Sequence, residues 1–124
     1  MKNVITSELQ LTQTKISFCY GEKTYNKFMI KNEYPSGSID IDAVTSITTN
    51  NKTGLFTITI GTKKHKNIYM LKGLIVHEIS HAVTQWMDYY GFSCDEVRSY
   101  TIQFLYMEFM VFLDERIELV VSNG

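Results

Sequence analysis

The chain has 124 residues, of which 44% are hydrophobic, so it can bury one core but is too short for two domains of ordinary size. Twelve basic and thirteen acidic side chains leave a formal net charge of -1, and the basic residues are scattered apart from a short run at 63–66. This balance argues against a nucleic-acid-binding surface. We therefore expect one domain, residues 1–124, that binds no nucleic acid.

No segment has the length and hydropathy of a signal peptide or a membrane span. The densest apolar stretch, residues 104–113, is interrupted by Glu108 and is typical of a buried helix or a subunit contact. We therefore expect a cytoplasmic protein that contacts no membrane. In that setting we expect Cys19 and Cys94 to remain reduced.

The first half of the chain contains three predicted strands. Residues 15–20, 38–48 and 55–61 alternate apolar and polar side chains and are rich in β-forming residues. The polar segment 50–54, which ends in glycine, is typical of a hairpin turn between the second and third of these strands.

Three helices are predicted. Residues 22–31 carry apolar side chains at i, i+3 and i+4, and a long helix is expected at 68–90, ended by the glycine that follows it. Ser93 and Glu96 have the Ser-x-x-Glu spacing of a capping box, which predicts another long helix running toward Val121.

The predicted element order is β-α-β-β-α-α. We expect a small α+β domain in which a three-stranded, mostly antiparallel sheet packs against the long helix 68–90 and a second long C-terminal helix. The C-terminal helix has apolar side chains on nearly every face, more than a domain of this size can bury. A homodimer contact along this helix is therefore one hypothesis.

The sequence His-Glu-Ile-Ser-His at residues 77–81 carries the most chemical information. Histidines at i and i+4 of a helix present two imidazoles on one face, which is the spacing that a zinc ion requires. Glu78 lies beside that face, where its carboxylate can accept a proton from a metal-bound water. This HExxH pattern is the signature of a zinc hydrolase. The alternative is that His77 and His81 are ordinary helix residues.

A catalytic zinc site usually has three protein ligands, so the chain must supply one more. The turn after the motif helix should return the start of the next helix toward the motif, which makes Cys94, Asp95 and Glu96 the nearest candidates. Glu96 is preferred because Glu reaches further than Asp and because Tyr100 and Gln103 continue its face with polar groups. The competing interpretation is that Glu96 only caps the helix. The third histidine of the chain lies in the basic run at 63–66 and is a less favoured ligand.

HExxH followed by a Glu on the next helix resembles the gluzincin branch of the zincin metallopeptidases. The segment Asp-Glu-Val-Arg-Ser-Tyr at 95–100 is similar to the Glu-x-x-Ala-Tyr segment of small zincin-like proteins encoded by bacteriophages. The resemblance covers about residues 71–105. It departs from the family in having Ser99 in place of Ala and in a short separation between His81 and Glu96.

The resemblance implies a Zn²⁺ cofactor, a minimal zincin-like fold and a peptide or protein substrate. It implies three zinc ligands, namely His77, His81 and Glu96. Glu78 would be the catalytic base. Tyr100 and Arg98 are the candidates for steadying the oxyanion, and the alternative is that each is a packed or ion-paired helix residue. Because zincins commonly bind substrate as an extra strand, we expect a peptide to add to the strand at 55–61. Gly73, one turn before His77, would leave space for substrate or for another backbone, and the alternative is a helix-packing contact.

Three functions follow from these features. The first is a zinc-dependent metallopeptidase or amidase that hydrolyses its substrate with a zinc-activated water. The second is a zincin-fold binding protein of phage or mobile-element origin that contacts a host or regulatory protein without catalysis. The third is a structural domain without metal. The carboxylate of Glu78 favours the first, because binding alone does not require it.

Overall fold

The computed structural model describes residues 2–35, 39, 42–49 and 55–123, and side chains as far as residue 117. These residues form four strands and three helices, in the order β1 (Val4–Leu9), β2 (Thr14–Tyr20), α1 (Glu22–Lys31), β3 (Ala43–Thr49), β4 (Phe56–Thr62), α2 (Ile68–Tyr90) and α3 (Asp95–Asn123). The predicted α+β class is confirmed. The hairpin turn predicted at 50–54 and part of the strand predicted from residue 38 lie outside the described residues.

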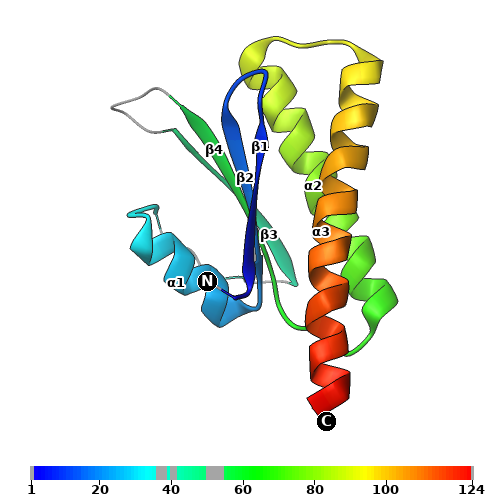
Figure 1. The fold of residues 1–124 in the computed structure, drawn as a ribbon. Coiled ribbons are helices and arrows are strands. Elements are labelled where there is room, and N and C mark those ends of the chain that lie inside the picture. The colour runs from blue at the N-terminus through cyan, green and yellow to red at the C-terminus, as the bar shows by residue number, and fades with distance from the viewer. Residues whose placement is uncertain (1, 36–38, 40–41, 50–54, 124) are drawn as a thin grey trace.

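The sheet has four strands in the order β1-β2-β4-β3 and is mixed, so the prediction of a three-stranded, mostly antiparallel sheet is wrong in detail (Figure 1). β1 pairs with β2 and β3 pairs with β4 in antiparallel fashion, whereas the central strands β2 and β4 are parallel. The parallel pair arises because α1 and β3 separate β2 from β4 in the chain and allow a crossover. β1 and β3 are therefore the two edge strands.

β1 is the strand that the sequence analysis missed. Its inward-facing positions are Ile5, Ser7 and Leu9, and the buried serine interrupts the apolar alternation by which a strand is recognised. β1 nevertheless forms because a short turn joins it to β2 in an antiparallel hairpin.

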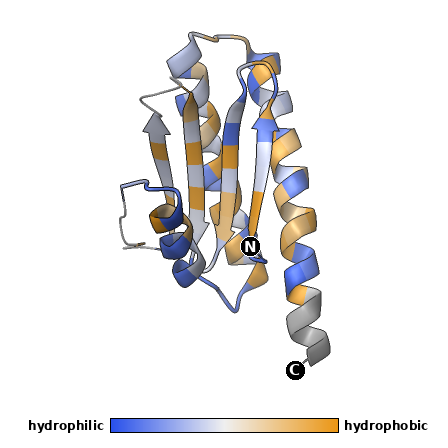
Figure 2. Cartoon of the chain, turned by 60° about the vertical axis from the view of Figure 1, so that its left-hand side comes forward, coloured by the Kyte–Doolittle hydropathy of each residue, from blue (hydrophilic) through white to orange (hydrophobic). Residues whose placement is uncertain are grey.

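Helices cover both faces of the sheet (Figure 1). α2 and α3 lie side by side on one face and share with it the larger hydrophobic core, which includes Ile16, Phe18 and Ile60. α1 packs on the opposite face through Tyr25 and Met29. Hydrophobic and hydrophilic residues alternate along the strands (Figure 2). Successive side chains therefore face opposite sides of the sheet.

α2 has the predicted bounds, and both of its ends are capped. The Asn67 side chain accepts hydrogen bonds from the backbone N–H groups of Tyr69 and Met70 at 3.0 and 3.2 Å. At the other end Gly91 adopts a left-handed conformation, with φ of 75°, which glycine accepts without steric cost. A well-defined helix therefore carries the HExxH motif.

α3 begins one residue later than the predicted capping box requires. Its first backbone hydrogen bond runs from the N–H of Arg98 to the carbonyl of Cys94, so Cys94 and not Ser93 occupies the capping position. No helix within the described parts of the chain is long and apolar enough to cross a membrane.

Candidate metal centre

The two motif histidines lie one turn apart on the exposed side of α2. Their Nε2 atoms approach to 3.0 Å, and the ring planes are nearly perpendicular. Two nitrogens bound to one tetrahedral zinc ion at 2.0–2.1 Å would be about 3.3 Å apart. The His77 and His81 nitrogens are therefore separated by nearly the distance that zinc requires. The same separation also suits a hydrogen bond from one ring to the other.

Glu78 is buried and faces β3. Its carboxylate accepts a short hydrogen bond from the Thr45 hydroxyl group, and the same hydroxyl lies 3.3 Å from the Glu78 carbonyl oxygen. One residue turns the helix by about 100°, so this carboxylate lies to one side of the imidazole pair. Thr45 thus holds the predicted catalytic base between the motif helix and the edge strand.

A hollow of about 330 Å³ separates this part of α2 from β3. It is lined by Ala43, Val44, Thr45, Ile47, Glu78, His81 and Gln85. The prediction that a peptide adds to the strand at 55–61 is wrong, because β4 is hydrogen-bonded to β2 on one side and to β3 on the other. The sheet edge beside the motif belongs to β3.

Arg98 borders the histidine face from the side of α3. Its guanidinium donates hydrogen bonds to the hydroxyl oxygens of Thr84 at 2.8 Å and Ser80 at 3.4 Å. Ser80 and Thr84 each lie three residues after a motif histidine, so they are its neighbours on the helix surface. A permanently charged cation therefore lies along one side of the candidate centre.

The structure does not bring Glu96 to the histidines. Glu96 precedes Arg98 by two residues, which is about 200° around the helix, so it leaves α3 on the side opposite α2 and is exposed. Cys94 and Asp95 are also exposed. Within the described residues, no three side chains of His, Cys, Asp or Glu lie close enough together to hold a metal ion.

Tyr100 lies away from the motif, whereas Gly73 leaves open space near it. Tyr100 lines a hollow with residues 8–10 of β1 and the adjoining turn, and β1 is the sheet edge opposite β3. A Cβ atom on Gly73 would meet no heavy atom within 4 Å, so this glycine is not a helix-packing contact. It leaves open space one turn before His77.

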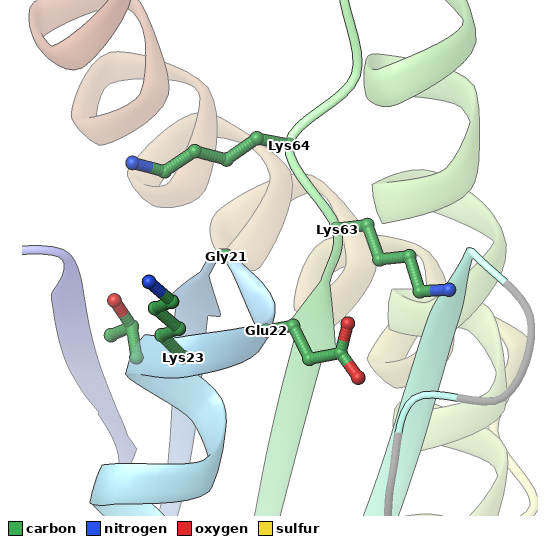
Figure 3. Close-up of a pocket in the computed structure, with 6 residues that line it drawn as sticks. Gly21, Glu22, Lys23, Lys63 and Lys64 are labelled. Carbon is green, nitrogen blue, oxygen red and sulfur yellow. The ribbon is translucent and has the colours of Figure 1, made fainter.

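A second hollow, of about 370 Å³, lies where α1 begins (Figure 3). Lys63 and Lys64, from the predicted basic run, line it together with Lys23 and with the carboxylate-bearing Glu22. Lys64 also lies over the ring of Tyr20, with its Nζ atom 5.3 Å from the ring centre. This hollow belongs to the α1 side of the molecule and shares no residue with the one at the motif.

Two contacts of the candidate centre had no signal in the sequence. Thr45 is 33 residues before Glu78, and Arg98 reaches back 14 and 18 residues to α2.

No family model, curated protein or solved structure matches the chain.

Proposed function

We propose that this protein is a zinc-dependent metallopeptidase in which His77 and His81 hold the ion and Glu78 is the general base. The observation that supports the proposal best is the close approach of the two Nε2 atoms, at 3.0 Å, on the part of α2 where His81 and Glu78 line the hollow at β3. A chance occurrence of the HExxH sequence would not require the two imidazole rings to approach each other. It would also not require the Glu carboxylate to bind a residue of a sheet edge.

The two imidazoles fit zinc, whereas the described residues supply no third ligand to the same point. Glu96 as that ligand stays a prediction that the orientation of α3 does not favour. A zinc ion held by the histidines would supply a Lewis acid for a scissile carbonyl and would lower the pKa of an attacking water. The Glu78 carboxylate would accept the proton of that water and deliver it to the leaving amine.

A peptide-like substrate is supported by the position of β3. The strand lies at the sheet edge, and its residues 43–45 and 47 line the hollow that also contains Glu78 and His81. An extended peptide that paired with this edge would carry its backbone carbonyls past the motif. Backbone pairing fixes the direction of such a peptide but gives little selectivity for its side chains.

The test is the isosteric substitution Glu78→Gln. We expect it to leave the zinc content unchanged and to lower the rate of peptide hydrolysis at least ~100-fold, because general base catalysis contributes roughly that much. Cleavage of a mixed peptide library, followed by mass spectrometry, gives the readout without a known substrate. Equal cleavage by the wild type and Glu78→Gln would contradict the assignment of the base.

A non-catalytic zincin-fold binding protein of phage or mobile-element origin is the second candidate, and Arg98 favours it. A guanidinium repels a divalent cation, so Arg98, which donates a hydrogen bond to Thr84 beside the histidine face, would weaken metal binding. This candidate keeps the metal as part of its scaffold and predicts that Glu78→Gln retains the biological effect. The peptidase predicts that Glu78→Gln loses it. Arg98→Met should raise zinc affinity under either proposal.

A further inference from the structure

α3 exposes a continuous apolar stripe that no part of the described chain covers. The stripe consists of Tyr100, Phe104, Met107 and Val111, which are 66%, 41%, 58% and 61% exposed. Their separations of four, three and four residues place them on one face of the helix. This face lies about 150° around α3 from Arg98, which points toward α2. A protein that bound the stripe would leave the histidine face open.

The size of the stripe matches half of a protein interface. Large side chains present about 150–250 Å² each, so these exposed fractions amount to roughly 400–500 Å² of apolar surface. A standard interface buries about 800 Å² per partner, of which ~56–65% is apolar. The stripe therefore supplies about the apolar area of one side of a stable dimer.

The stripe is also complementary to itself. Its spacing of four, three and four residues reads the same in both directions, so an antiparallel copy of the helix places its apolar residues in register. Tyr100 would then lie opposite the partner's Val111, and Phe104 opposite the partner's Met107. Each aromatic ring meets a smaller or more flexible side chain, as close packing requires. Twofold interfaces have this isologous form.

We propose that the protein is a homodimer in which α3 packs antiparallel against α3 of a second copy through this stripe. The proposal is independent of the metal centre. Charged substitution at the centre of the stripe tests it, with Met107→Glu as the variant and Ile30→Glu as the control. Ile30 is 69% exposed on α1, across the sheet from α3 (Figure 1). Circular dichroism verifies that both variants fold.

Sedimentation equilibrium gives the mass. We expect the wild type and Ile30→Glu to have twice the 14.4 kDa mass of the chain. For Met107→Glu we expect the dissociation constant of the dimer to be at least tenfold larger. A wild-type protein that is monomeric at 200 μM would overturn the proposal, because the stripe would then bind a different partner. A dimer that Met107→Glu leaves intact would also overturn it, because another face would form the contact.

Disulfide trapping tests the antiparallel register. The variants Tyr100→Cys and Val111→Cys are made in a Cys94→Ser background. In the proposed dimer each new cysteine lies about 16 Å along the helix axis from the same position in the partner, which is too far for a disulfide. We expect neither protein to form a disulfide with itself under mild oxidation and an equimolar mixture to form the mixed disulfide. Self-linked Tyr100→Cys would indicate parallel helices and overturn the proposed arrangement. A mixture without the mixed disulfide would overturn it as well.

Discussion

At the scale of single residues, the contact between Thr45 and Glu78 determines where the predicted base lies. A buried carboxylate that loses its hydrogen-bond donor leaves acceptor capacity unsatisfied in a poorly hydrated site. We therefore expect Thr45→Val to lower the free energy of unfolding by about 1.5–3 kcal/mol, as measured by urea denaturation. Thr45→Ser keeps the hydroxyl group and is the matched control. A cost below ~0.5 kcal/mol for Thr45→Val would show that the bond is dispensable.

The two cysteines should differ strongly in reactivity. Burial raises the pKa of the Cys19 thiol to about 12, whereas Cys94 is exposed at the start of α3. Because the thiolate is the reactive form, we expect one fast-reacting thiol in the folded protein at pH 8 and two in denaturant. Titration with Ellman's reagent measures both. Cys94→Ser should abolish the fast reaction, and a fast thiol remaining in that variant would contradict the burial of Cys19.

The residues of the candidate metal centre form two groups, according to how far apart in the sequence the contacting residues lie. His77, Glu78 and His81 are related by the helical repeat alone, so their placement could be predicted from five residues. Thr45 and Arg98 reach the motif from a strand and a helix elsewhere in the chain. Sequence periodicity contains no information about contacts of that kind.

At the scale of elements, two glycines have opposite environments and form a matched pair. A Cβ atom on Gly61 would lie 2.5 Å from Cδ2 of the Tyr25 ring, whereas one on Gly73 would meet nothing within 4 Å. We expect Gly61→Ala to destabilise the protein by about 1–3 kcal/mol through overpacking between β4 and α1.

Gly73→Ala should stabilise the protein by about 0.5–1 kcal/mol, because it replaces glycine in the interior of α2. Thermal unfolding of both variants beside the wild type checks the pair. A neutral Gly61→Ala would show that α1 is not packed against β4 as described. A destabilising Gly73→Ala would indicate a partner for that surface.

Strong local signals predicted α1 and α2 with their observed bounds. β1 was missed because Ser7 occupies an inward position, and the start of α3 was misplaced by one residue because Cys94 accepts the first helical hydrogen bond. The orientation of α3 around its axis, and not its first residue, determines where Glu96 lies. With Arg98 bound to Thr84, Glu96 is turned away from the motif.

At the scale of the whole molecule, strand order determines which edge lies beside the motif. Sequence proximity favoured β4, but the crossover through α1 places β4 between β2 and β3. The sequence had predicted the individual strands β2 and β4 but not their parallel pairing. Strand order depends on which helices pack on each face of the sheet. The periodicity of apolar residues along the sequence does not specify this.

The proposed dimer should respond to salt. Glu96 flanks one end of the stripe, and Glu115, which is paired with Arg116 at 3.1 Å, flanks the other. Glu96 would therefore lie near the partner's Glu115 in the antiparallel arrangement. Screening of like charges should therefore tighten the dimer several-fold between ~0.01 and 0.15 M salt, as the Debye length falls from about 30 to 8 Å. Sedimentation at the two salt concentrations measures this. Glu115→Gln should flatten the dependence, and a dimer that weakens with salt would contradict the proposed pairing.

The zinc content of the purified protein shows whether His77 and His81 form a metal site. The matched control is His65→Ala, which removes the one histidine outside the motif. We predict about one zinc ion per chain in the wild type and in His65→Ala, and less than ~0.2 in His77→Ala, because the proposed site requires both motif histidines as ligands. A wild-type content below ~0.2 that His77→Ala leaves unchanged would contradict the proposed metal site.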